Sequence, residues 1–204
     1  MMCGSKVVYS ALVKLKTLHV CTVKWNQHYN DLPPWKFIFR KCTKTTHDAQ
    51  LRWFQFRLIY RLLPTKRYLY LRKLSDSALC TFCGNVDETI THLFWDCRHV
   101  QNFWNAVQVW LKTNCDNCAT FVLSEIFTLF GTAKNFRSDR VVDLIMLIAK
   151  FYIYKCRLQE TLPDFDAFIS LVKYRYQIER YNHIATGQFH KFLREWFPYE
   201  ALVA

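Results

Sequence analysis

The sequence predicts a mainly α-helical fold. Apolar residues recur at helical spacing over most of the 204 residues, and only four glycines and five prolines interrupt them. So few turn residues argue against a β-sandwich or a barrel. The four glycines also stand far apart, which excludes the GxGxxG and Walker A loops that bind phosphates in many enzymes.

The first predicted helices follow one another closely. One covers residues 48–63, where apolar residues recur every three or four positions, and the run TTHD at 45–48 is similar to a capping box with Asp in place of Glu. Because this helix is apolar on two sides, we expect it to be buried between neighbours. Pro64 ends it, and Thr65 caps a second, short helix at 66–74.

A loop or small hairpin is expected at 75–90, around the cysteines described below. Apolar stripes and punctuating Gly, Pro and turn residues then predict the later helices, with Ser138 as the cap of the long one; they lie at about 98–112, 123–130, 138–157 and 164–184, before a last segment ending at Pro198. By composition the chain divides into four parts: an N-terminal remainder or connection (1–34), a basic-aromatic helical segment (35–75), a zinc-binding segment with the following helix (76–118) and a helical C-terminal tail (119–204).

The net charge of +12 is concentrated in the segment 35–75. This segment holds eleven basic residues against one acid, Asp48, a net charge of +10. The candidate nucleic-acid-binding residues are these eleven: Lys36, Arg40, Lys41, Lys44, Arg52, Arg57, Arg61, Lys66, Arg67, Arg72 and Lys73.

Nine aromatic residues are interleaved with these cations, from Trp35 to Tyr70. Cations neutralise phosphates and aromatic faces stack on unpaired bases, so the segment favours RNA or DNA as a partner. The alternative is a solvated basic face over an aromatic core. Several of these aromatics must belong to the core, so none is assigned to stacking from sequence.

The nine cysteines are an odd, scattered number, which does not suit a secreted disulfide framework. The N-terminal 20 residues make a poor signal peptide, and no stretch of 18 apolar residues exists. We therefore expect a reduced intracellular protein of the nucleus or cytoplasm, not secreted and without a membrane partner.

Residues 80–97 read CTFCGNVDETITHLFWDC. The spacing Cys80-x2-Cys83-x8-His92-x4-Cys97 offers three thiolates and one imidazole, the ligands of a closed, tetrahedral structural zinc site. We expect a small helical domain organised around one Cys3His zinc knuckle, with one structural Zn²⁺. His99 in place of His92 is the alternative fourth ligand, and a chance cluster of buried cysteines is the alternative to a metal.

The remaining polar motifs have simpler interpretations. Cys115-x2-Cys118 is a turn with two thiols, or else a redox pair or a metal site shared with Cys156 or His99. Acid pairs at 139/143 and 164/166 open helices, where carboxylates suit the helix dipole. No acid–base or nucleophile constellation is recognisable, so we expect no enzyme activity and no small-molecule substrate.

The run ALCTFCGNVDETITHLFWDCRHVQNFW at 78–104 resembles the zinc-binding segment that follows the reverse transcriptase domain in LINE-type non-LTR retrotransposon polyproteins. Glu88-Thr89, His92-Leu93-Phe94 and Phe103-Trp104 match that family's pattern. The upstream helix with its Leu63-Pro64-Thr65 step and the downstream run AKFYIYKCR are similar too. The resemblance covers roughly residues 35–196 and is strongest at 48–104.

The resemblance implies zinc at Cys80, Cys83, His92 and Cys97, and a role in holding element RNA or target DNA near the polymerase. It does not imply polymerase activity, because the chain lacks the Asp-Asp pair of the polymerase motif. The chain is similar to a C-terminal piece of such a protein. The alternative function is a zinc-organised protein-interaction module that docks on a polymerase or on an acidic partner.

Overall fold

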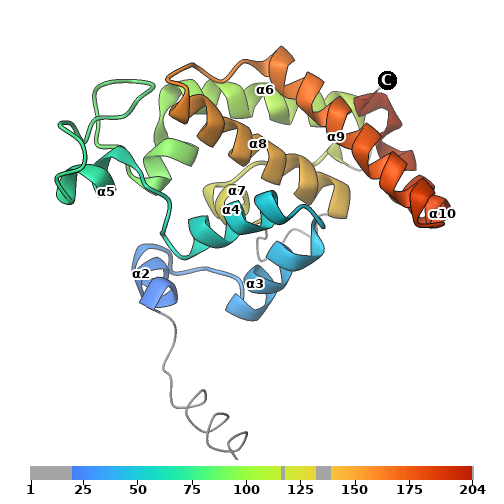
Figure 1. Ribbon diagram of the computed structural model, residues 1–204, viewed down its shortest axis with the longest axis horizontal. Helices are drawn as coiled ribbons and strands as arrows, with labels where there is room; N and C mark the ends of the chain where they lie inside the picture. The colour runs from blue at the N-terminus through green and yellow to red at the C-terminus, as the bar shows by residue number, and fades with distance from the viewer. Residues whose placement is uncertain (1–19, 116–117, 132–138, 204) are drawn as a thin grey trace, which may run out of the picture.

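The structure is a computed structural model that describes residues 20–115, 118–131 and 139–203 (Figure 1). Its α-helices are α2 (Val20–His28), α3 (Trp35–Lys44), α4 (Ala49–Ile59), α5 (Lys66–Leu71), α6 (Arg98–Asn114), α7 (Glu125–Phe130), α8 (Arg140–Leu158), α9 (Phe165–Ala185) and α10 (Phe189–Trp196). A π-helical turn, η1 (His92–Asp96), precedes α6, and a 3₁₀-helix, η3 (Phe197–Leu202), follows α10. The described residues form no β-strand, and a lone bridge joins Leu79 to Asp87. The predicted mainly α-helical class is confirmed.

Helix α8 is the centre of the core. Every residue from 141 to 150 is buried, so this helix has no solvent face over three turns. Helices α4, α9 and α10 and the turn η1 all contact it, and α6 lies beyond it against α9 (Figure 1). None of the described helices combines the length and the apolarity that crossing a bilayer requires.

Helix α4 begins differently from the capping box expected at 45–48. Asp48 itself is the N-cap, and its carboxylate accepts the backbone N–H groups of Gln50 and Leu51. The helix also ends one turn earlier than predicted, at Ile59. Arg61 adopts a positive φ of 57° there, and the amide of Leu62 donates to the carbonyl of Arg57. The chain therefore leaves the helix through a left-handed turn before Pro64 can stop it.

The other predicted elements differ mainly at their ends. Thr65 caps α5 as expected, by accepting the N–H of Tyr68, but α5 stops at Leu71, and Lys73 takes a positive φ of 58°. Asp139 is the N-cap residue of α8; the predicted cap, Ser138, lies outside the described residues. Asp164 caps α9 by accepting the N–H of Ala167, which agrees with its expected place at a helix start.

Helix α2 lies within the part predicted as an N-terminal connection, yet it is tied into the core. The side chain of Trp25 is fully buried, and its indole N–H donates to the carbonyl of Ile59 at 2.8 Å. The guanidinium of Arg61 lies over the same indole, 4.5 Å from the ring centre. These contacts hold α2 against the end of α4.

Arg140 joins the C-terminal helices to the turn after α3. Its guanidinium pairs with the carboxylates of Glu179 and Glu195, each at 2.7 Å, and donates to the carbonyl of Thr45 at 3.0 Å.

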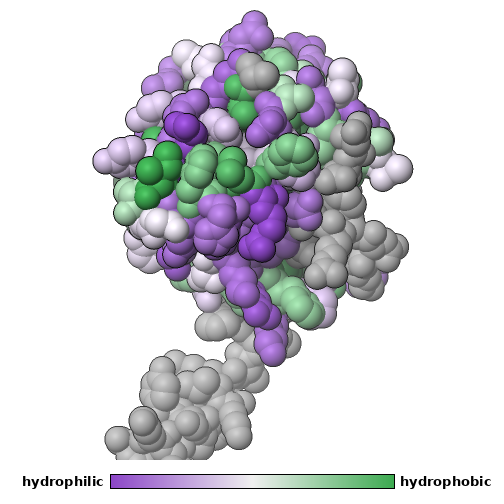
Figure 2. Space-filling model, turned by 90° about the vertical axis from the view of Figure 1, so that its right-hand side faces the viewer, coloured by the Kyte–Doolittle hydropathy of each residue, from purple (hydrophilic) through white to green (hydrophobic). Residues whose placement is uncertain are grey.

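The surface at the end of the molecule formed by α9 and α10 mixes hydrophilic side chains with a band of hydrophobic ones (Figure 2). Leu193 and Phe197 are among the exposed apolar residues of this region.

Candidate metal centre and basic surface

Cys80, Cys83, His92 and Cys97 place one ligand atom each within 4.8 Å of the others. The Sγ atoms of Cys80 and Cys97 are 4.0 Å apart, and the Sγ of Cys83 is 3.4 Å from Nε2 of His92. A tetrahedral zinc ion with bonds of about 2.3 Å to sulfur and about 2.0 Å to nitrogen has edges of about 3.8 Å and 3.5 Å. These two separations are close to the two edges, and the other ligand pairs lie within 4.8 Å, so the four side chains could hold one zinc ion.

The first two candidate ligands, Cys80 and Cys83, come from a tight turn. The N–H of Gly84 donates to the carbonyl of Cys80 at 2.9 Å, and Gly84 has a φ of 67°. A side chain would be strained in this left-handed conformation, although nothing lies within 4 Å of an added Cβ. The N–H of Phe82 points at the sulfur of Cys80, at 3.4 Å, as expected for a turn that supports a thiolate.

The other two ligands stand at the two ends of the turn η1. Thr89 accepts the N–H of His92 through its hydroxyl at 3.0 Å, and the N–H of Cys97 donates to the carbonyl of His92 at 3.0 Å. The wider π-helical turn brings positions 92 and 97 to the same side. The indole N–H of Trp104 on α6 donates to the carbonyl of Phe94 at 2.8 Å and holds this turn against α6.

The position of Cys97 favours its thiolate. The pKa of this thiol is lowered to about 7, first by the hydrogen bond from Cys80 and then by the backbone N–H groups of His99 and Val100. Cys97 is the N-cap of α6, where the helix dipole also stabilises negative charge. The pKa of Cys80 is raised, because it donates in that shared hydrogen bond and is buried.

The alternative ligand His99 lies outside this group. Its Nε2 accepts the Nε–H of Arg98 at 3.4 Å. Cys115 and Cys118 are also apart from the four. Both thiols are buried, and burial together with the hydrogen bond that the Cys118 thiol donates to Cys115 raises the pKa of Cys118 to about 12. Among the described residues, no second cluster of three ligands that could hold a metal was found.

Sequence reasoning missed the group that anchors the turn at 80–84, which we call the metal turn. The carboxylate of Glu88 is fully buried and accepts the Nε–H of Arg157 at 2.8 Å. It also accepts the N–H of Lys66 at 2.8 Å, and both the N–H and the hydroxyl of Thr81, at 3.1 and 2.9 Å. One side chain therefore joins the metal turn to α5 and α8. An acid between two metal ligands was the available signal.

The predicted basic residues fall into two sets. Some are engaged by the protein: Lys41 bonds Asp143 at 2.6 Å, Arg67 pairs with Asp87 at 3.1 Å, and Lys66 lies 3.7 Å from Glu160. Arg61 and Arg72 lie over the rings of Trp25 and Tyr68. The second set makes no ion pair within the described ranges: Lys36, Arg40, Lys44, Arg52, Arg57 and Lys73.

All but one of this second set stand on α3 and α4, which pack against each other. Arg40 and Lys44 line a cavity of about 420 Å³ together with Phe37, whose side chain is 54% exposed. We call the outer surface of these two helices, with the five cations that form no ion pair in the described part of the chain, the basic face. The turn that carries Cys80 and Cys83 follows α5 in the chain and contributes no residue to the basic face.

The metal group and its neighbouring helices lie in a part of the sequence that matches a known protein family. Residues 17–104 match the family model described as zinc-binding in reverse transcriptase. This range contains all four metal-group residues and both helices of the basic face. The family description and the Cys3His geometry together support the predicted zinc cofactor.

Proposed function

We propose that this chain is a zinc-stabilised accessory domain of a LINE-type reverse transcriptase that binds RNA or DNA and acts without catalysis of its own. Five cations on α3 and α4 that pair with no acid among the described residues carry the proposal. Phosphates are the partners that such a surface attracts most strongly. Zinc holds the adjoining turn in place and does no chemistry, since four protein ligands leave no open position.

Reduced thiols are a condition of this role. The structure's cysteines in the described ranges are all free, and zinc is bound only by deprotonated, unoxidised sulfur. We therefore propose that the domain acts inside the cell, in the nucleus or cytoplasm.

A salt-titrated gel shift with RNA and DNA tests this function. We expect the affinity of the zinc-loaded protein to fall steeply with salt, and Arg40→Ala with Arg57→Ala to reduce the slope of log K against log [salt] by about 2. Arg194→Ala, an exposed arginine on α10, is the matched control and leaves the slope unchanged. Binding that ignores salt, or no binding by folded protein, would refute the proposal.

The alternative is a protein-docking module, and one observation favours it. Leu71 and Leu74, at and after the end of α5, are 72% and 70% exposed beside Arg72 and Lys73. Exposed apolar side chains next to cations suit an acidic protein surface. If this module is the function, charge reversal beside these leucines, Arg72→Glu with Lys73→Glu, disturbs a complex with the polymerase domain and leaves RNA retention unchanged.

A further inference from the structure

We propose that the basic face binds single-stranded nucleic acid, by stacking unpaired bases on a row of aromatic rings that starts at Trp53. This inference rests on the proposed function and narrows it to one form of nucleic acid. Five rings form the aromatic row: Trp53 and Phe56 of α4, Tyr60 at its C-cap, and Phe39 and Trp35 of α3.

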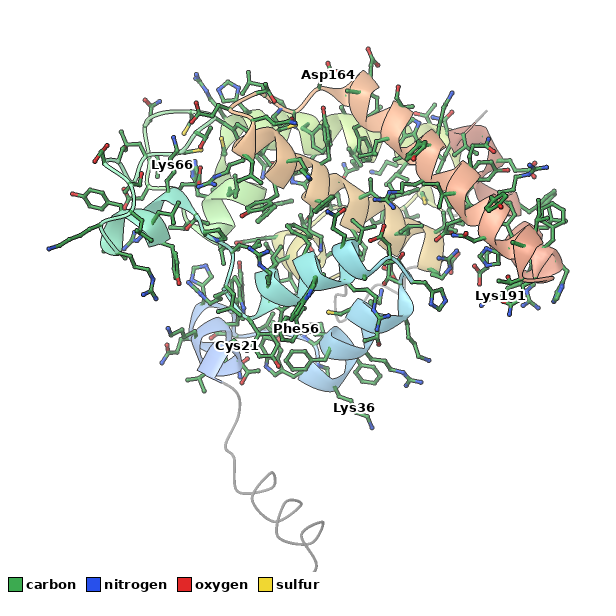
Figure 3. The ribbon with its side chains drawn as sticks, in the orientation of Figure 1. Cys21, Lys36, Phe56, Lys66, Asp164 and Lys191 are labelled. Atoms are coloured by element: carbon green, nitrogen blue, oxygen red, sulfur yellow. The ribbon has the colours of Figure 1, made fainter. Side chains whose placement is uncertain are left out.

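The rings of the aromatic row are in continuous contact. The ring centres of Trp53 and Phe56 are 5.2 Å apart, and those of Phe56 and Tyr60 are 4.1 Å apart in a stacked pair. The row then crosses to α3, where Phe39 lies 5.7 Å from Tyr60 and 5.7 Å from Trp35. Figure 3 shows Phe56 between the two helices, with Lys36 extending outward from α3.

Burial does not account for the outer end of this row. The core face of α4 is complete without it, since Leu51, Phe54 and Leu58 are buried against the centre of the molecule. Trp53 instead leaves 63% of its side chain exposed, at the end of a row whose other members are half-buried. The inner rings hold Trp53 on a rigid support, and its remaining surface is open to a planar ligand.

The charges around the row select a polyanion. Arg57 follows Trp53 by one helical turn and Arg52 is its neighbour, and neither makes an ion pair in the described part of the chain. The nearest acid in sequence, Asp48, is occupied by its capping bonds and by Arg175. A basic surface with an exposed ring on a rigid support is the arrangement that binds single strands without sequence preference.

A duplex would satisfy the cations and leave the rings unused. Base faces inside a double helix are covered by their neighbours, so an aromatic side chain reaches them only at unpaired positions. An acidic protein segment would also pair with the cations, but it has no bases to stack. The aromatic row therefore distinguishes a single strand from the other two partners.

The test compares Trp53→Ala with Trp53→Phe on an oligo-dT strand of about 20 nucleotides and on a duplex of the same length. We expect Trp53→Ala to weaken single-strand binding about 5- to 150-fold, the range for loss of one stacked base, and to leave duplex binding unchanged. Trp53→Phe retains a ring and recovers most of the affinity. Tyr174→Ala, which removes an aromatic of 62% exposure from α9, is the matched control and changes neither.

A second measurement uses the unaltered, zinc-loaded protein. A strand carrying 2-aminopurine reports stacking directly, and we expect its fluorescence to change on binding. No change, or an equal loss of both ligands in Trp53→Ala, overturns stacking while salt-dependent binding, and thus the proposed function, stands. Absence of any salt-dependent binding overturns both.

Discussion

Replacement of Glu88 by alanine removes the group that joins the metal turn to the helical core. The change leaves the guanidinium of Arg157, which is 7% exposed, without its carboxylate. It also leaves three donors from Lys66 and Thr81 without an acceptor. Breaking a buried ion pair by removing one partner costs about 3–5 kcal/mol, because the remaining charge stays desolvated. We expect a loss of that size in the free energy of unfolding, and a fall in Tm of roughly 6–20 °C.

Urea unfolding of the zinc-loaded protein, followed by circular dichroism, measures this loss. Glu160→Ala is the control: its carboxylate is 74% exposed and 3.7 Å from Lys66, so its removal costs less than about 0.5 kcal/mol. Glu88→Gln retains an acceptor for the backbone donors and falls between the two. If Glu88→Ala unfolds within about 1 kcal/mol of the unaltered protein, Glu88 is not the joint between the metal turn and the core.

Three further changes test other parts of the structure. Chelation of zinc should unfold the turn at 80–97, at a cost on the order of 10 kcal/mol, and Co²⁺ absorption should report tetrahedral thiolate binding that Cys97→Ser loses and Cys115→Ser retains. Burial lowers the pKa of Lys150 to about 7, although Cys42 and Asp143 act in the opposite direction. Between pH 7 and about 10 the unfolded chain therefore binds more protons at this residue than the folded protein does. Lys150 thus makes the free energy of unfolding rise with pH over that window. Lys150→Met should remove that rise. The measurement is the change in unfolding free energy from pH 7 to pH 9 in each of the two proteins; an equal change in both would contradict the lowered pKa of Lys150. Gly84→Ala should destabilise the zinc-loaded protein by about 1 kcal/mol through its positive φ, and an equally stable variant would argue against that backbone conformation.

Local signals predicted most of the helices but located their ends less well. Apolar spacing places the centres of α4, α6 and α9, because each buries one side or more against a neighbour. The end of α4 depends instead on a left-handed residue, Arg61, and on the contact of its side chain with Trp25, 36 positions earlier in the chain. No local sequence pattern predicts the turn at Arg61, because the indole of Trp25 that contacts it lies far away in the sequence.

The four residues of the candidate zinc site could be proposed from spacing, since a CxxC turn and a following His and Cys lie within 18 residues. Their convergence in the structure depends on the π-helical turn η1, which sequence periodicity does not distinguish from an ordinary helix start. The anchoring pair of Glu88 and Arg157 is separated by 69 positions and was invisible in sequence.

The sequence by itself determined the helical class, the concentration of positive charge at 35–75 and the set of thiols and imidazole at 80–97. These follow from composition and short-range spacing, which act through the chain's own neighbours. The tertiary structure decided which cations form ion pairs and which aromatic side chains are buried: among the described residues Lys41 bonds Asp143 across 102 positions, while Trp53 stays 63% exposed. Pairing and burial are long-range properties, and only the folded arrangement of the helices sets them.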